Sequence, residues 1–149
     1  MRTRPWWFYR QSAVIPYRRT EAGVEVLLIT SRRRSRWIIP KGVVDLETTA
    51  RESAGKEAYE EAGLLGDLSA SPVGEYEYKK WGGMCVVTVY LLDVHTVLEK
   101  WPEEEMRARR WLPAAEAAAL VEEPQLRKLI LSVRDRLRRE RISLVPAAQ

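Results

Sequence analysis

The amino-acid sequence predicts a single α/β domain over residues 1–149. Short apolar runs rich in branched residues, typical of strands, occur in the first third of the chain and again after residue 72. Segments with helix signals lie between and after these runs. A chain of 149 residues suits one domain that buries roughly two-thirds of its unfolded surface. Residues 1–10 are a candidate N-terminal arm, and residues 142–149 are expected to form a weakly ordered tail.

The first half of the chain predicts strands followed by one helix. Residues 12–16 and 24–30 are expected to be strands separated by a turn at residues 20–23, and residues 37–39 form a third extended run that Pro40 ends. Thr49 with Glu52 three places later is a capping box, which predicts that a helix begins there. Gly63 is a suitable residue just beyond its end.

The second half predicts further strands and two helices. Residues 73–78 and 86–94 are expected to be strands joined by a turn at residues 81–83, and residues 106–112 to be another strand. Helices are predicted over residues 114–121 and 124–141. The second of these has an apolar face, formed by Leu126, Leu129, Ile130, Val133 and Leu137.

Charge is divided unevenly along the chain, although the net charge is only +4. Residues 1–41 carry +8, residues 42–78 carry −7, and the remainder carries +3. A basic segment followed by an acidic one fits a site in which cations neutralise carboxylates and arginines bind an anionic substrate.

Composition also excludes several classes of protein. No run approaches the roughly 18 apolar residues that would span a membrane, and the N-terminus lacks the apolar core of a signal peptide. The single cysteine, Cys85, cannot form an internal disulfide, so the cytoplasm is the expected compartment.

Three carboxylates are predicted to share one face of the helix that follows Gly42. Glu57, Glu60 and Glu61 are spaced three and four apart, so they are neighbours on a helix surface. Like charges held this close destabilise a helix unless a cation binds between them. Carboxylate oxygens are preferred ligands of Mg²⁺ and Mn²⁺, and these are the predicted cofactors.

The stretch from Gly42 to Leu64 resembles the signature of the Nudix hydrolases. That signature reads Gly, five residues, Glu, seven residues, Arg-Glu, an apolar residue, any residue, Glu-Glu, any residue, Gly and an apolar residue. Gly42 opens the match, and residues 56–64, KEAYEEAGL, close it in register. Thr48 and Lys56 stand where the signature has Glu and Arg, residues thought to brace the loop against the helix. A contact from Glu47 or Glu52 to Lys56 is the expected replacement.

The resemblance implies a mixed β-sheet sandwiched between helices (α-β-α) and hydrolysis of a phosphoanhydride bond. It assigns the catalytic site to Glu57, Glu60 and Glu61. Glu57 and Glu61 become the principal metal ligands, and Glu60 a further ligand or the residue that orients water. The backbone carbonyl of Lys41 is a candidate additional ligand.

Within the family, the run RWIIPKG and the later segment from residue 96 resemble the branch that hydrolyses diphosphoinositol polyphosphates and dinucleoside polyphosphates. This implies a phosphorylated small-molecule substrate, or more broadly a nucleoside diphosphate-linked one. The candidate substrate-binding residues are basic: Arg10, Arg32, Arg34, Arg36, Lys41, Lys79 and Lys80. The acidic run Glu103, Glu104 and Glu105 lies where some members place a distal carboxylate.

Two other functions remain open at this point. Thr48 and Lys56 depart from the signature. The first alternative hypothesis is therefore that the chain is a catalytically silent module that binds a nucleotide or phosphorylated ligand. The basic cluster at residues 32–36 suggests a second alternative, binding of nucleic acid. This alternative is not favoured, because the sequence has no basic motif interleaved with aromatic residues.

Overall fold

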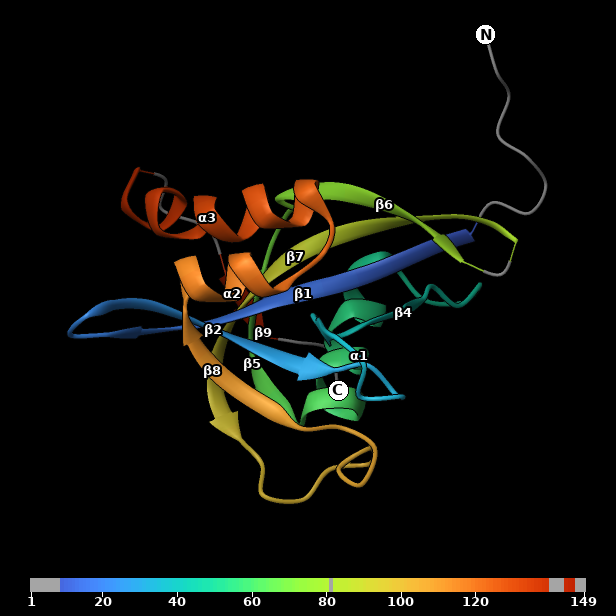
Figure 1. The fold of residues 1–149 in the computed structure, drawn as a ribbon, viewed down its shortest axis with the longest axis horizontal. Helices are drawn as coiled ribbons and strands as arrows, with labels where there is room; N and C mark the ends of the chain where they lie inside the picture. Colours follow the sequence, from blue (N-terminus) through green and yellow to red (C-terminus); the bar gives the residue numbers. More distant parts are fainter. Residues whose placement is uncertain (1–8, 81, 140–143, 147–149) are drawn as a thin grey trace, which may run out of the picture.

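The computed structural model describes residues 9–80, 82–139 and 144–146 (Figure 1). The described helices are α1 (Ala50–Ala62), α2 (Ala114–Leu120) and α3 (Pro124–Arg139). The described strands are β1 (Tyr9–Thr20), β2 (Gly23–Thr30), β3 (Trp37–Ile38), β4 (Lys41–Val43), β5 (Leu64–Ser69), β6 (Gly74–Lys80), β7 (Gly83–Val97), β8 (Arg109–Pro113) and β9 (Leu144–Pro146). Of the predicted N-terminal arm, residues 1–8 lie outside the described residues, as does Trp81 of the predicted turn.

The strands form one mixed sheet with β1 at its centre. β1 runs parallel to β7 from Tyr9 to Tyr17, whereas it pairs antiparallel with β2 and with β4. The main path of the sheet is β3-β2-β1-β7-β5-β9, and β4, β6 and β8 pair with β1, β7 and β2 respectively. The long β1 therefore carries its first residues past β4 and its last residues into the hairpin with β2.

Helices cover both faces of this sheet, which confirms the predicted α-β-α arrangement (Figure 1). On one face, α1 packs through Ala54, Ala58 and Ala62, which are all buried. Small side chains bring the helix backbone close to the sheet, so the carboxylates of α1 lie near the strands. On the other face, α2 and α3 cover β1, β2, β6 and β7 with apolar side chains such as Leu126 and Ile130. Within the described residues, none of the helices has the length and apolar character needed to cross a bilayer.

The two ends of α1 are as predicted. Thr49 accepts a hydrogen bond from the backbone of Glu52, and the Glu52 carboxylate accepts one from the backbone of Thr49, each at 3.0 Å. Gly63 follows the helix with a left-handed φ of 66°, which favours glycine. These caps fix where the acidic face of the helix starts and stops.

Three strands were not predicted, and each has a physical reason. β4 has only three residues, too few to show a periodic pattern. β5 is irregular because Gly66 lies at a register shift, where the backbone of Asp93 comes so close that a side chain would collide with it. β9 lies inside the segment predicted to be a weakly ordered tail, where residues 144–146 pair with β5. Residues 142, 143 and 147–149 of the tail lie outside the described residues.

The strand predicted over residues 106–112 begins later, at Arg109. Met106 instead ends a turn, because its backbone N–H donates to the carbonyl of Glu103 at 2.9 Å. The last helix ends at Arg139 within the described residues, and residues 140 and 141 of its predicted span lie outside them.

Replacing Thr49 by alanine should destabilise the protein through the start of α1. The variant loses the side-chain acceptor for the Glu52 N–H, which costs about 1 kcal/mol and lowers the melting temperature by about 2–4 °C. Thr49→Ser keeps the hydroxyl and should melt near the wild type. Equal melting temperatures for Thr49→Ala and Thr49→Ser in a thermal unfolding experiment would contradict the proposed importance of the cap.

Candidate active site

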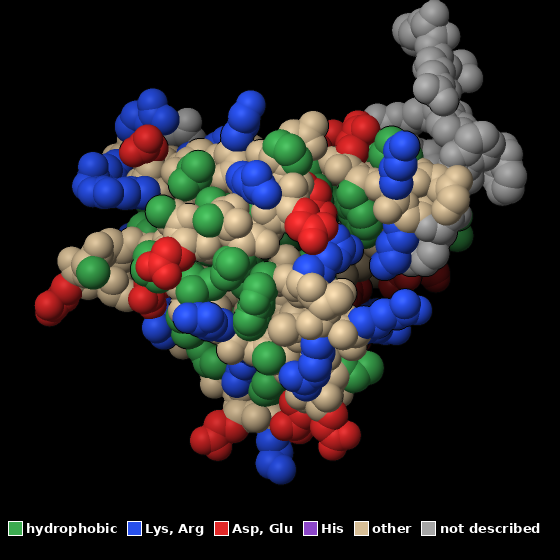
Figure 2. All heavy atoms as spheres, in the orientation of Figure 1, with side chains coloured by type: hydrophobic (Ala, Val, Ile, Leu, Met, Phe, Trp, Pro, Cys, Tyr) green, Lys and Arg blue, Asp and Glu red, His purple; other side chains and the backbone are tan. Residues whose placement is uncertain are grey.

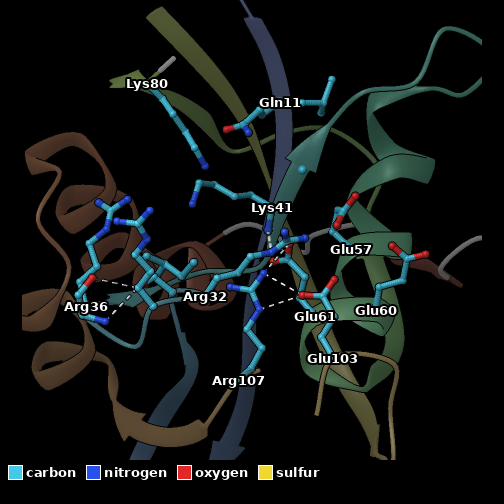
Figure 3. Close-up of a pocket in the computed structure, with 16 residues that line it drawn as sticks. Gln11, Arg32, Arg36, Lys41, Glu57, Glu60, Glu61, Lys80, Glu103 and Arg107 are labelled. Atoms are coloured by element: carbon cyan, nitrogen blue, oxygen red, sulfur yellow. Dashed lines mark hydrogen bonds and ion pairs between the residues drawn. The ribbon is translucent and has the colours of Figure 1, made fainter. Parts of the chain in front are cut away.

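A cavity of about 630 Å³ lies between α1, β4, the loop after β2 and the loop before β8 (Figure 3). One part of its lining is acidic and another is basic. The acidic lining residues are Glu57, Glu60, Glu61 and Glu103. The basic lining residues are Arg32, Arg33, Arg36, Lys41, Lys80 and Arg107.

Close contact between α1 and β4 positions two of the carboxylates. The Glu57 carboxylate lies directly against Gly42, where any Cβ atom would overlap it. The Glu61 carboxylate accepts a hydrogen bond from the backbone N–H of Lys41 at 3.1 Å. A side chain at position 42 would therefore displace the Glu57 carboxylate. The bond to Glu61 fixes the peptide at Lys41.

The loop before β8 selects Glu103 from the acidic run. The backbone N–H of Glu103 donates to the carbonyl of Glu60 at 3.1 Å. The indole N–H of Trp101 donates to the carbonyl of Glu61 at 3.0 Å. These bonds tie the loop to the last turn of α1. As a result Glu103 lines the cavity, whereas Glu104 and Glu105 are exposed and do not.

Arg107 is the principal residue that the sequence did not reveal. Its side chain is buried, with the residue 5% exposed, and its guanidinium lies 2.9 Å from Glu103 and 3.3 Å from Glu61. It also donates to the carbonyl of Thr30 at 3.1 Å. One fixed cation thus lies between two of the carboxylates, and its spacing of four from Glu103 was the only sequence signal.

Burial and mutual repulsion raise the pKa of two carboxyl groups on the acidic side of the cavity. Burial, together with repulsion from the nearby Glu61 and Glu60 carboxylates, raises the pKa of Glu57 to about 7. Burial also raises the pKa of Glu61, while Arg107 and the Lys41 N–H oppose that rise. The described residues provide no cation partner for Glu57. Ionisation of both Glu57 and Glu61 is therefore unfavourable unless a positive charge binds.

This donor set fits a hard divalent cation. It consists of the carboxylate oxygens on α1 and the backbone carbonyl of Lys41, which directly precedes Gly42 in the sequence. Mg²⁺ and Mn²⁺ prefer oxygen ligands of these kinds. As the side chains stand, no three acidic, histidine or cysteine residues in the described part of the chain are grouped around one ion position. In Figure 3 the Glu60 side chain extends to the side, away from Glu61.

Four of the seven predicted substrate-binding residues line the cavity, namely Arg32, Arg36, Lys41 and Lys80. Arg10, Arg34 and Lys79 do not; Arg34 donates instead to the backbone carbonyl of Glu105 at 3.2 Å. Gln11 and Arg33 line the cavity and were not among the predicted site residues. In Figure 2, Lys and Arg side chains lie over α3 and also on the right, beside the β6–β7 hairpin and the loop after β2.

The basic residues differ in how firmly they are held. Arg36 lies 3.5 Å from both Glu122 and Glu123, so the linker between α2 and α3 holds it. Lys41 lies over the Tyr78 ring, with its Nζ 5.2 Å from the ring centroid. Burial lowers the pKa of Lys41 to about 8, with Glu61 opposing the change and Arg36 and Lys80 adding to it.

The predicted contact from Glu47 or Glu52 to Lys56 was wrong. The Lys56 ammonium lies 3.6 Å from Asp45, and Glu52 is already used by the capping box. Thr48 reaches the same part of the loop, because its backbone N–H donates to the Asp45 carbonyl at 3.2 Å. The contact between Lys56 and Asp45 is exposed, so its contribution to stability is small.

Comparison with protein families matches the NUDIX domain model to residues 8–133. Nudix hydrolase 13, mitochondrial, of Arabidopsis thaliana is 36% identical over 110 residues, which cover 67% of this chain and 54% of that protein. Diphosphoinositol polyphosphate phosphohydrolase 2 of Rattus norvegicus is 32% identical over 118 residues, which cover 77% of this chain and 64% of that protein. The chain thus spans between about half and two-thirds of the length of these curated relatives.

Solved structures share the fold at lower sequence identity. The C. elegans Ap4A hydrolase aligns with a TM-score of 0.71 at 19% identity, covering 87% of this chain and 98% of that one. The E. coli dihydroneopterin triphosphate pyrophosphohydrolase aligns with a TM-score of 0.65 at 20% identity, covering 85% and 94%. These likenesses support the mixed sheet with flanking helices.

Removing the buried guanidinium should strongly destabilise the protein. In Arg107→Met, Glu61 and Glu103 lose their cation while remaining partly buried, so the free energy of unfolding should fall by about 3 kcal/mol. Arg107→Lys should lose less, because it keeps the charge but not the planar fork. Urea denaturation measures the free energy of unfolding of both variants. Arg110→Met, which removes an exposed arginine from β8, is the matched control and should change stability by less than about 0.5 kcal/mol; equal stability of the two methionine variants would contradict this role of Arg107.

The metal-free protein should lose stability as pH rises from about 4.5 to about 7. In this window the folded state binds a proton at Glu57 that the unfolded state has released, so raising the pH removes this contribution. The melting temperature in EDTA should fall by about 5 °C between pH 5 and pH 8. Glu57→Gln cannot titrate and should melt above the wild type at pH 8, with a flatter profile. Parallel profiles for the two proteins would show that Glu57 does not titrate as described.

Proposed function

The chain belongs to the Nudix family, and we propose that it is a metal-dependent pyrophosphohydrolase that cleaves a phosphoanhydride bond in a polyphosphorylated small molecule. The observation that supports this function best is the division of one cavity into an acidic and a basic side. A diphosphate carries several negative charges, so it needs cations both at the bond that is cleaved and along the rest of the molecule.

The acidic side is the proposed metal site. Glu57, Glu61 and the Lys41 carbonyl would hold Mg²⁺ or Mn²⁺, with Glu60 as a further ligand or the residue that orients water. When bound, the ion supplies charge neutralisation of the phosphate oxygens and a lowered pKa of bound water. Glu103 lines the same cavity from the loop before β8, where Arg107 holds its carboxylate at 2.9 Å, and it is the proposed distal carboxylate.

The basic side is the proposed substrate site. Arg32 and Arg33 are exposed at the cavity and make no ion pair within the described residues, so their guanidinium groups can bind phosphate in a bidentate manner. Arg36 is fixed by Glu122 and Glu123, and offers a third cation. Bound phosphate groups would therefore lie between these cations and the metal ligands.

Among the substrates implied by the family, the cavity favours a diphosphoinositol polyphosphate over a dinucleoside polyphosphate or a nucleoside diphosphate-linked molecule. Its described lining has many cations but no aromatic side chain on which a base could stack. One relative, the rat enzyme, is named as a diphosphoinositol polyphosphate phosphohydrolase.

We further propose a reducing compartment such as the cytoplasm. Cys85, the lone cysteine, is buried and free. The names of several Arabidopsis relatives assign those proteins to mitochondria or the chloroplast.

A substrate panel tests the proposed function. Phosphate release is measured from a diphosphoinositol polyphosphate, diadenosine tetraphosphate, a nucleotide sugar and capped RNA, each with EDTA, Mg²⁺ or Mn²⁺. We expect metal-dependent turnover that is greatest with the diphosphoinositol polyphosphate. Binding without turnover across the panel would instead support the silent binding module suggested by Thr48 and Lys56, and turnover of capped RNA alone would support a nucleic-acid enzyme.

Glu61→Gln should lower kcat at least about 100-fold, because an anionic metal ligand becomes neutral. Glutamine retains an acceptor for the Lys41 N–H, so the circular dichroism spectrum should stay unchanged. Glu104→Gln removes an exposed carboxylate from the neighbouring loop and should keep wild-type turnover. If Glu61→Gln turns over normally at saturating Mg²⁺, the assignment of Glu61 as a ligand fails.

A further inference from the structure

Gln11 is a buried polar residue in the wall of the cavity, away from the carboxylates. It is 4% exposed and lies on β1, paired with Val43 of β4 on one side and Val87 of β7 on the other. Strands on both sides fix its backbone, and its side chain lines the cavity. Buried side-chain polar groups are usually hydrogen-bonded, so the partners of this amide determine what it can bind.

Tyr78 on β6 holds one end of this amide. Its hydroxyl donates to Oε1 of Gln11 at 2.5 Å. This distance suits an O–H···O bond and is shorter than the usual range for an N–H donor, so the amide oxygen faces Tyr78. The amide N–H groups of Gln11 are then left to face the cavity as donors.

Two ammonium groups approach the same region. Figure 3 shows the side chains of Gln11, Lys41 and Lys80 pointing toward one another from three different strands. The Lys41 ammonium lies over the ring of Tyr78, so the tyrosine supports two of the three groups. These three groups offer only hydrogen-bond donors to the cavity, and two of them are cations. A phosphate group, with several acceptor oxygens and negative charge, is the ligand that satisfies such a set.

We propose that Gln11, Lys41 and Lys80 form a phosphate subsite, in which Tyr78 orients the Gln11 amide as a donor. This inference rests on the proposed function in taking the bound phosphate to belong to the substrate, at a position remote from the bond that is cleaved. Gln11 is then a specificity-determining residue, because it favours substrates that carry a phosphate at that distance over substrates that carry an uncharged group there.

The side-chain amides of the protein give a direct test by NMR. The sequence has no asparagine, and its side-chain amides are those of Gln11, Gln125 and Gln149. Tripolyphosphate is titrated into the ¹⁵N-labelled, metal-free full chain, and Gln11→Met assigns the Gln11 signals. We expect the Gln11 NH₂ signals to shift with saturation, while those of Gln125, which lies on α3 outside the cavity, stay in place. Unshifted Gln11 signals at saturation would overturn the proposal.

Calorimetry with the same probe measures the contribution of each residue. Gln11→Met should weaken tripolyphosphate binding about tenfold, and Tyr78→Phe about threefold, because the amide is retained but no longer oriented. Gln125→Met is the matched control; it removes the acceptor for the backbone N–H of Glu77, also on β6, and should bind like the wild type. Equal affinity of Gln11→Met and Gln125→Met would overturn the subsite, as would a wild type that does not bind the probe. A protein that shows these binding differences but hydrolyses nothing in the substrate panel would retain the subsite and lose the proposed function.

Discussion

The contact between α1 and β4 is the constraint on which the site depends. Alanines on one side of α1 let the helix approach the sheet, and Gly42 lets the Glu57 carboxylate lie against the β4 backbone. The bond from the Lys41 N–H to Glu61 then sets how the helix and strand are aligned. Substituting Gly42 would push Glu57 away, so the glycine and the glutamates in the family signature form a single structural unit.

Arg107 makes this concentration of carboxylates compatible with folding. Burying several carboxylates without a cation would be costly, and Arg107 lies between Glu61 and Glu103 while its own charge is buried among them. Glu57 has no such partner in the described residues, and burial raises its pKa to about 7. The site is therefore neutralised on one side and left ready for a further cation on the other.

The sequence predicted what depends on local spacing. Helical periodicity placed Glu57, Glu60 and Glu61 on one face, and the capping box located the start of α1. The sequence could not predict the roles of Arg107 and Gln11. Arg107 bonds to Thr30 and Gln11 to Tyr78, and each pair is distant in the chain and brought together only by the fold. The sequence also could not show which of the consecutive glutamates 103–105 lines the cavity. Glu103 does so because backbone and indole hydrogen bonds tie its loop to the end of α1. β4, at three residues, was too short to leave a pattern.

The two helical layers support opposite sides of the cavity. α1 carries the carboxylates directly, whereas the linker between α2 and α3 acts through Glu122 and Glu123, which hold Arg36 at 3.5 Å. Arg36 is thereby kept in place without a ligand, at the cost of partial neutralisation by two acids. Arg32 and Arg33 line the cavity and have no ion-pair partner within the described chain. Among these three arginines, one cation is oriented and two are unpaired within the described chain. This combination would suit the proposed ligand, whose several phosphate groups must be both positioned and neutralised.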